Sequence, residues 1–166
     1  MWVIGLSGSG KTTLGNALCE DLRHKKINVV HLDGDLVREL FRNDLSHSIE
    51  GRRANSKRLV KLSEFLDMNK INVVCSVVSL FPEHRQQLRE TVSDYFEVFV
   101  DTDLDVLKQR DSKGLYEKFD RGELKDLAGL DLHFPTPINP DLLISNNDSI
   151  TNFLNNVAYL GKKFEK

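Results

Sequence analysis

A glycine-rich stretch near the start of the sequence carries the residue types that hold a triphosphate. Residues 5–12 read Gly-Leu-Ser-Gly-Ser-Gly-Lys-Thr, which satisfies the G-x-x-x-x-G-K-[ST] pattern. Such glycines let backbone N–H groups turn around a β-phosphate, and the following helix start adds a positive dipole. Lys11 would reach the β- and γ-phosphates, and the Thr12 hydroxyl would ligate Mg²⁺. We predict that ATP and Mg²⁺ bind here, through Gly5, Ser7, Gly8, Ser9, Gly10, Lys11, Thr12 and Thr13.

A glycine-rich turn can also be a plain connection between a strand and a helix. Here an apolar run precedes it and helical spacing follows it, which is the context of a phosphate-binding loop and favours nucleotide binding. An NTPase or switch protein would direct the bound phosphates at water, whereas a kinase would direct them at an acceptor. The remainder of the chain has to separate these classes.

Two carboxylates follow the next apolar run. Residues 31–35 read His-Leu-Asp-Gly-Asp, so Asp33 and Asp35 stand at the end of a predicted strand, near the phosphate-binding loop. In phosphoryl transfer a carboxylate orients and deprotonates the attacking hydroxyl or holds the water shell of the metal. We predict Asp35 as the base, with Asp33 as its partner and Lys11 as the catalytic cation. The alternative is that both carboxylates only cap the helix that starts near Leu36.

Polar and cationic side chains gather downstream of these carboxylates. Arg52 and Asn55 are three residues apart and so share one helix face. With Arg38 and Arg58 they would form a cluster able to grip an anionic substrate. Taken singly, each arginine is more typical of a solvated surface residue.

A third group of polar residues follows the third predicted strand. Ser79 ends this strand, and Arg85 and Arg89 stand at i and i+4 on the next predicted helix. We expect the two arginines to add positive charge near the same edge of the sheet.

The elements that must position these groups alternate between strands and helices. Apolar runs rich in β-branched residues occur at 2–6, 27–32, 71–78, 96–100 and 142–144. Amphipathic helices are predicted after Lys11, over 50–70, and after a cap at Asp148 and Ser149. Strands without strict polar alternation imply a sheet covered on both faces. We predict an α/β, three-layer P-loop NTPase fold with a central parallel sheet of about five strands and ligands at the strands' carboxyl ends.

Length and composition agree with one globular domain over residues 1–166. The chain is 40% hydrophobic and 29% charged with a net charge of −2, so DNA, RNA and anionic membranes are not expected as partners. Cys19 and Cys75 lie in a predicted helix and a predicted buried strand, which suggests no disulfide and a cytoplasmic location. No stretch has the length of a signal peptide's or membrane span's apolar run.

Residues 111–140 break this alternation. The segment lacks apolar periodicity and contains Gly114, Gly122, Gly129 and prolines at 135, 137 and 140. A connection of this length is usually functional or mobile. We predict that it is a mobile lid over the active site.

Taken together, these motifs resemble the adenylylsulfate (APS) kinase family, which transfers the ATP γ-phosphate to the ribose 3′-hydroxyl of APS. The resemblance rests on GLSGSGKTT at 5–13, LDGD at 32–35 with Arg38, Arg52 with Asn55, Ser79, RDSKGLY at 110–116 and GELK at 122–125. It implies that Asp35 is the acceptor-side base and that Arg110 binds ATP. The substrate-binding residues that it implies are Asp35, Arg38, His47, Arg52, Asn55, Ser79, Lys113, Gly114, Leu115 and Leu127. A lid with Lys113 and Lys118 would exclude water and bring cations to the phosphoryl group, which favours a kinase.

The chain departs from the family where the base of the acceptor is expected. In the family, two phenylalanines stack on the adenine of APS, in L-G-F-S and F-T-G-I-D stretches. Here His47 and Leu127 stand at those positions, and the Ser-Pro pair after the third strand is Ser79-Leu80. A stacked base is worth about 1–3 kcal/mol, so we expect weak adenine binding. We infer that 3′-phosphorylation of a ribonucleotide is kept and the base is changed, most simply to a smaller one.

Several functions fit this inference. Cytidine diphosphoramidate kinase of bacterial capsule biosynthesis is an APS-kinase-like enzyme that acts on a cytidine nucleotide, and the chain resembles that branch. A genuine APS kinase for sulfate assimilation and a non-catalytic nucleotide-binding regulator are the alternatives. His47 would hydrogen-bond a base edge or be a solvated loop residue. Family members often form homodimers, so the resemblance implies a homodimer as one assembly state.

Overall fold

The computed structural model describes residues 1–165 and is built around a parallel β-sheet. Its strands are β1 (Trp2–Ile4), β2 (Val29–Asp33), β3 (Asn72–Val77), β4 (Glu97–Asp101) and β5 (Leu142–Ser145). They are arranged in the order β2-β3-β1-β4-β5, and all four pairings are parallel. The predicted α/β class and the five-stranded parallel sheet are confirmed.

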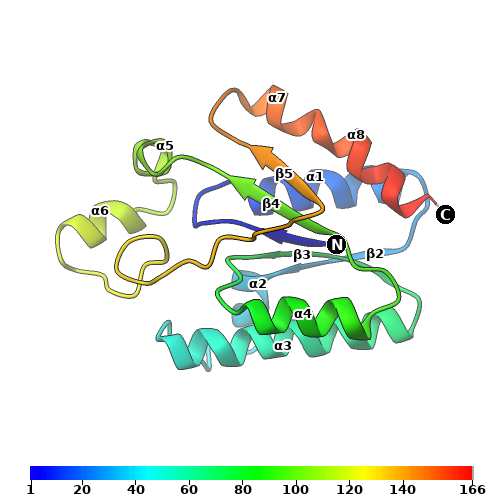
Figure 1. Ribbon diagram of the computed structural model, residues 1–166, viewed down its shortest axis with the longest axis horizontal. Coiled ribbons are helices and arrows are strands. Elements are labelled where there is room, and N and C mark those ends of the chain that lie inside the picture. Colours follow the sequence, from blue (N-terminus) through cyan, green and yellow to red (C-terminus); the bar gives the residue numbers. More distant parts are fainter. Residues whose placement is uncertain (166) are drawn as a thin grey trace.

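Helices cover both faces of the sheet. They are α1 (Lys11–His24), α2 (Gly34–Leu40), α3 (Ile49–Met68), α4 (Pro82–Thr91), α5 (Leu104–Arg110), α6 (Leu115–Asp120), α7 (Ile150–Leu154) and α8 (Asn156–Gly161), followed by a 3-10 turn at Lys162–Phe164. Helices α3 and α4 lie on one face, and α1, α7 and α8 lie on the other (Figure 1). This is the predicted three-layer arrangement. Among residues 1–165, none of the helices has the length and apolar character needed to span a bilayer.

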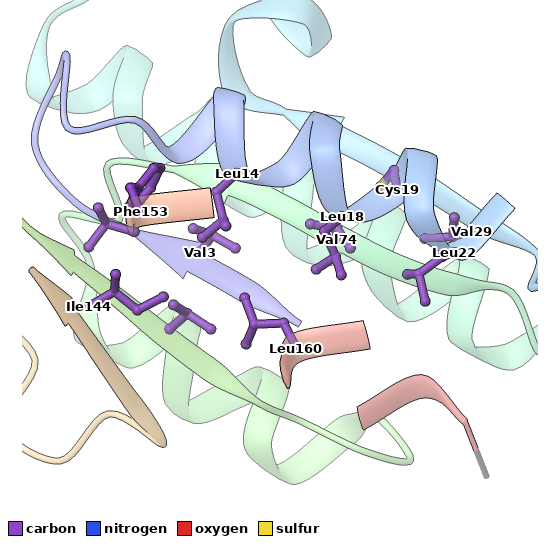
Figure 2. Close-up of a cluster of buried hydrophobic side chains, with 12 residues drawn as sticks. Val3, Leu14, Leu18, Cys19, Leu22, Val29, Val74, Ile144, Phe153 and Leu160 are labelled. Carbon is purple, nitrogen blue, oxygen red and sulfur yellow. The ribbon is translucent and has the colours of Figure 1, made fainter. Parts of the chain in front are cut away.

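Each central strand is buried on both faces because its side chains alternate between two cores. Val3 packs with α1, α7 and α8 in the cluster shown in Figure 2, whereas Trp2 and Ile4 pack on the opposite face with α3 and α4. The two cysteines are divided in the same way, since Cys19 belongs to the first cluster and Cys75 to the second. Both are free and buried, and Cys75 lies in a buried strand, as predicted.

Two elements differ from the sequence expectations. The last helix is broken between α7 and α8, where the Asn156 side chain donates to the carbonyl of Phe153 (2.8 Å) and competes with helix continuation. Ser149 caps α7, with its hydroxyl accepting from the Asn152 N–H. The segment 111–140 contains the short helix α6, whose first turn donates to the Asp111 carboxylate from the N–H groups of Tyr116 (3.1 Å) and Glu117 (2.9 Å).

Candidate active site

The carboxyl ends of the strands, and the loops that follow them, enclose a cavity of about 550 Å³. The segment that carries α5 and α6 lies at this end of the sheet (Figure 1). Sixteen of the predicted site residues line the cavity: Ser7, Gly8, Gly10, Lys11, Thr12, Thr13, Asp33, Asp35, Arg38, His47, Arg52, Asn55, Ser79, Lys113, Leu115 and Leu127. Residues from six separate stretches of the chain therefore meet in one place, as the motif analysis requires.

The phosphate-binding loop starts where β1 ends and is packed tightly underneath. A Cβ on Gly5 would lie 2.5 Å from the carbonyl oxygen of Val100 and 2.6 Å from the Ser9 hydroxyl, so a larger residue does not fit there. The Ser9 carbonyl accepts a hydrogen bond from the Asn146 amide (2.8 Å). Gly5 and Ser9 thus form the buried base of the loop and do not line the cavity.

Lys11 is buried at the start of α1 and is held against the loop. Its ammonium donates to the Leu6 carbonyl at 2.6 Å. Burial, and then the charge of Lys113, lowers the pKa of Lys11 from 10.5 to about 8, although Asp33 and Asp35 oppose the shift. An incoming phosphate would restore the charged form because it supplies the missing negative partner.

Asp33 performs two tasks at the end of β2. Its carboxylate accepts from the N–H groups of Asp35 (2.9 Å) and Leu36 (3.3 Å) and so caps α2, and it accepts from the Thr12 hydroxyl at 2.6 Å. Asp33 therefore does cap α2, but it does not only cap it, since it also accepts from Thr12. The Thr12 and Asp33 oxygens are hard donors of the kind that Mg²⁺ prefers. Among residues 1–165, no group of three or more His, Cys, Asp or Glu could hold a metal.

Asp35 does not cap a helix with its side chain. Its carboxylate pairs instead, at 2.5 Å, with the Lys113 ammonium of residues 111–140, the predicted lid and hereafter the lid segment. Burial acts to raise the pKa of Asp35, but the hydrogen bond and charge of Lys113, with the charge of Lys11, outweigh it and the pKa lies below its usual value. Asp35 is thus an ionised carboxylate at the cavity, with the lid lysine against it.

Two of the predicted substrate arginines are occupied by backbone carbonyls. The Arg38 guanidinium is buried and donates to Leu45 (3.0 Å) and Ser46 (3.2 Å), which fixes the loop that carries His47. Arg52 donates to the carbonyl of His47 (2.8 Å) and to that of Asp126 (2.8 Å). Arg52 thereby joins the 45–48 loop to the lid segment.

Three further predicted substrate-binding residues, Asn55, Ser79 and His47, differ in the hydrogen-bonding atoms that they present to a ligand. Asn55 donates to the Gly34 carbonyl (3.2 Å), while its own Oδ1 is buried and has no hydrogen-bond partner within residues 1–165. The Ser79 hydroxyl accepts from the Trp2 indole N–H (3.3 Å). Partial desolvation, with the charges of Arg38 and Arg52, lowers the pKa of His47, which favours the neutral imidazole.

The lid segment is attached to the phosphate-binding loop by a buried tyrosine. The Tyr116 hydroxyl donates to the Ser7 carbonyl at 2.9 Å, and burial raises the pKa of this phenol to about 12. Leu127 is only 3% exposed and packs with Tyr116 and Leu107. Gly114 begins α6 with a φ of 64° and does not line the cavity.

Arg110 lies in a second, smaller cavity of about 290 Å³ that shares Gly8, Gly10 and Thr13 with the first. Its guanidinium donates to the carbonyls of Asn146 (2.8 Å) and Asp148 (3.3 Å). The predicted ATP-site arginine is therefore next to the phosphate-binding loop, on the side away from Asp35.

Four cations that the sequence suggested for the site do not line the cavity. Arg58 pairs with Asp44 (2.8 Å) and lies over the Phe41 ring. Lys118 is exposed and outside the cavity lining. Arg85 and Arg89 also do not line it, and both face Glu97, at 3.8 and 3.3 Å.

Some cavity residues were not predicted from the sequence. Ser56 stands four residues after Arg52 on α3, and Phe81 stands two after Ser79. Helical spacing from Arg52 would have found Ser56. Phe81 has no comparable signal, since it reads as an apolar residue before the proline that starts α4.

Comparison with known proteins gives consistent results. The family model described as adenylylsulphate kinase matches residues 1–145. A probable adenylyl-sulfate kinase of Synechocystis sp. is 40% identical over 142 residues, covering 86% of this chain and 80% of the relative. A cytidine diphosphoramidate kinase of Campylobacter jejuni is 36% identical over 147 residues, covering 89% and 85%. The solved Mycobacterium tuberculosis APS kinase in complex with AMPPNP and APS superposes with a TM-score of 0.89 at 33% identity, covering 99% of this chain and 96% of that one.

Proposed function

The chain belongs to the adenylylsulphate kinase family and is an ATP-dependent kinase, and from that premise we propose that its acceptor is a nucleotide other than APS. We propose transfer of the γ-phosphate to the ribose 3′-hydroxyl of a smaller-base nucleotide, such as cytidine diphosphoramidate. The observation that carries this proposal is the make-up of one cavity. Lys11 and Asp35 line it together with His47 and Leu127, so a phosphoryl-transfer site adjoins an altered base pocket.

The contacts support a direct transfer between two bound nucleotides. In the proposed reaction the acceptor's 3′-oxygen forms a bond to the γ-phosphorus, the bond to the β–γ bridging oxygen breaks, and ADP leaves. The hydroxyl proton passes to Asp35, which is ionised and lies at the cavity. Lys11 and Lys113 offset the charge of the transferring group. When held by Thr12 and Asp33, Mg²⁺ supplies further charge neutralisation on the phosphate oxygens.

The base pocket supports a changed acceptor because neither position offers a phenylalanine ring. Leu127 turns into the apolar cluster with Leu107 and Tyr116 and is nearly inaccessible. The neutral His47 imidazole has one donor and one acceptor nitrogen, which suits the edge of a pyrimidine. Two lost stacking contacts of about 1–3 kcal/mol each would weaken adenine binding.

We also propose that the chain forms one kinase domain in which residues 111–140 act as a mobile lid. The bonds from Lys113 to Asp35 and from Tyr116 to Ser7 support this, since they join the segment to both sides of the cavity. We propose a cytoplasmic location for the protein, because the proposed reaction consumes ATP. The expected homodimer stays a prediction, to be tested by analytical ultracentrifugation.

The test is a panel of acceptors with γ-labelled ATP and Mg²⁺. We expect label on the 3′-position of cytidine diphosphoramidate, less transfer to APS, and loss of both in Asp35→Asn. A preference for APS would instead support a genuine APS kinase, the candidate favoured by the 40% identical relative. Tight ATP binding without transfer to any ribose hydroxyl, and no effect of Asp35→Asn, would reduce the chain to a nucleotide-binding regulator.

A further inference from the structure

Arg85 lies behind the cavity wall, where its guanidinium contacts the carboxyl end of β3, the lid segment and β4. Its Nη1 donates to the carbonyl of Ser79 at 3.2 Å and to that of Pro135 at 3.5 Å. Its Nε lies 3.8 Å from the carboxylate of Glu97. Arg85 is 8% exposed, so these contacts are shielded from water. One side chain therefore ties together segments that are distant in the sequence.

One of these partners, Ser79, lines the cavity, and another, Pro135, belongs to the segment 111–140. Ser79 has a φ of 61°, an unfavourable conformation for a residue with a side chain, and residues 79–81 line the cavity. Pro135 belongs to the arm by which the lid returns to β5. Beside it, Phe134 packs against Phe99, with ring centroids 6.0 Å apart. Both carbonyls thus belong to segments whose position depends on Arg85 as a donor.

The third partner is rigid. Glu97 is the first residue of β4 and is 3% exposed. Its carboxylate accepts from the Tyr95 hydroxyl at 2.7 Å and pairs with Arg89 at 3.3 Å, and its N–H donates to Asp141 at 2.7 Å. Because Glu97 is fixed in the central sheet, its carboxylate holds one end of the Arg85 guanidinium while the other end donates to Ser79 and Pro135.

We propose that Arg85 is a positioning residue for the acceptor: it fixes the 79–81 wall and the return arm of the lid by donating to Ser79 and Pro135. The proposal rests on the proposed kinase reaction. Arg85 does not line the cavity, so it acts through these backbone segments and not by touching substrate. None of these three partners of Arg85 belongs to the phosphate-binding loop at residues 5–12.

Arg89 provides a matched control: it pairs with the same Glu97 carboxylate, but within residues 1–165 its ion-pair partners are Glu97 and Asp141, and it has no bond to Ser79 or Pro135. In Arg85→Lys the charge beside Glu97 remains, but one ammonium replaces a planar guanidinium whose Nη1 reaches both carbonyls while its Nε faces Glu97. With cytidine diphosphoramidate and APS as acceptors, we expect the acceptor KM to rise about tenfold, the effect of one hydrogen bond from a charged donor. The KM for ATP should change less than about twofold, and acceptor-independent ATP hydrolysis should increase. Arg89→Lys should leave all three values unchanged.

A second readout does not depend on catalysis. We expect trypsin to cut the lid of Arg85→Lys, at Lys113, Lys118 or Arg121, faster than it cuts the lid of the wild type or of Arg89→Lys. The comparison is made between proteins that have the same thermal unfolding midpoint. Arg85→Gln serves the same comparison if the lysine variant does not fold. Equal effects of the two lysine substitutions, or equal changes in both KM values, would show a purely structural role and overturn the proposal. A wild type without transfer would refute the kinase reaction, whereas unchanged lid cleavage in Arg85→Lys would refute the positioning role.

Discussion

Replacing Lys113 by methionine separates stability from catalysis at the Asp35–Lys113 pair. The two charged groups are 2.5 Å apart, but their side chains are 51% and 62% exposed. Exposed ion pairs contribute about 0–1 kcal/mol to folding. We therefore expect the free energy of unfolding of Lys113→Met, measured by urea denaturation, to fall by less than about 1 kcal/mol.

The expected catalytic effect is much larger. Lys113 lines the cavity with Lys11 and Asp35, where it would offset charge on the transferring phosphoryl group. Loss of one such preorganised donor costs about 10²- to 10³-fold in kcat, or roughly 3–4 kcal/mol of activation free energy. Turnover of the variant should therefore fall by this factor while the protein stays folded. Lys118→Met is the control, since Lys118 belongs to the same segment but is exposed and outside the cavity lining.

The pH profile of the same variant tests the electrostatics. In the wild type, we expect activity to be lost as the pH falls through the depressed pKa of Asp35, because the proposed base must be ionised. Burial raises the pKa of Asp35, and Lys113 makes the largest contribution that lowers it. Removing Lys113 should therefore raise the pKa of Asp35 and move the acid limb of the pH profile to higher pH. Lys113 also lowers the pKa of Lys11, so loss of Lys11 charge should move to higher pH as well. An acid limb that stays in place or moves down, or equal losses in Lys118→Met, would refute the reasoning.

Two further predictions concern the phosphate-binding loop and the lid. The pKa of Lys11 is about 8 and bound triphosphate favours the charged form, so ATP affinity should weaken as the pH rises through about 8, with proton uptake in calorimetry; a flat profile matching that of Lys11→Arg would contradict this. Gly129 has a φ of 88° and a Cβ there would lie 2.8 Å from Leu6, whereas Gly122 has a φ of 73° and open space. Gly129→Ala should therefore destabilise by about 1–3 kcal/mol and Gly122→Ala by about 1 kcal/mol in urea denaturation; equal losses would mean that the Leu6 contact is unimportant.

The layer order of the fold was predictable because short apolar runs and helical spacing report burial directly. Residues 2–4 are apolar without alternation, and the structure buries them on both faces of β1. The strand ends were less well predicted at β1, where Gly5 already belongs to the loop. The break at Asn155 was missed because apolar spacing continues through it, while the competing hydrogen bond from Asn156 leaves no trace in periodicity.

The site was predictable in its membership and less so in its contacts. Residue type and spacing identified Lys11, Asp35 and Arg52 as neighbours, since the carboxyl ends of parallel strands meet at one edge. The sequence pattern does not reveal which hydrogen-bond acceptor an arginine side chain will contact. Arg38 donates to a carbonyl of the loop that follows α2, and Arg58 pairs with Asp44. The positions of these oxygens depend on tertiary folding and not on sequence spacing.

The altered base pocket has a structural consequence for how acceptor choice changes within this fold. Position 47 is exposed on a loop held through backbone carbonyls by Arg38 and Arg52, so its side chain can vary without disturbing the loop. Position 127 is 3% exposed against Tyr116, which itself bonds the phosphate-binding loop. A larger side chain there would press on the lid's attachment, where overpacking typically costs about 1–3 kcal/mol. Under the proposed function, base recognition at position 47 would be free to change alone, whereas at position 127 it would be coupled to the contact between residues 111–140 and the phosphate-binding loop.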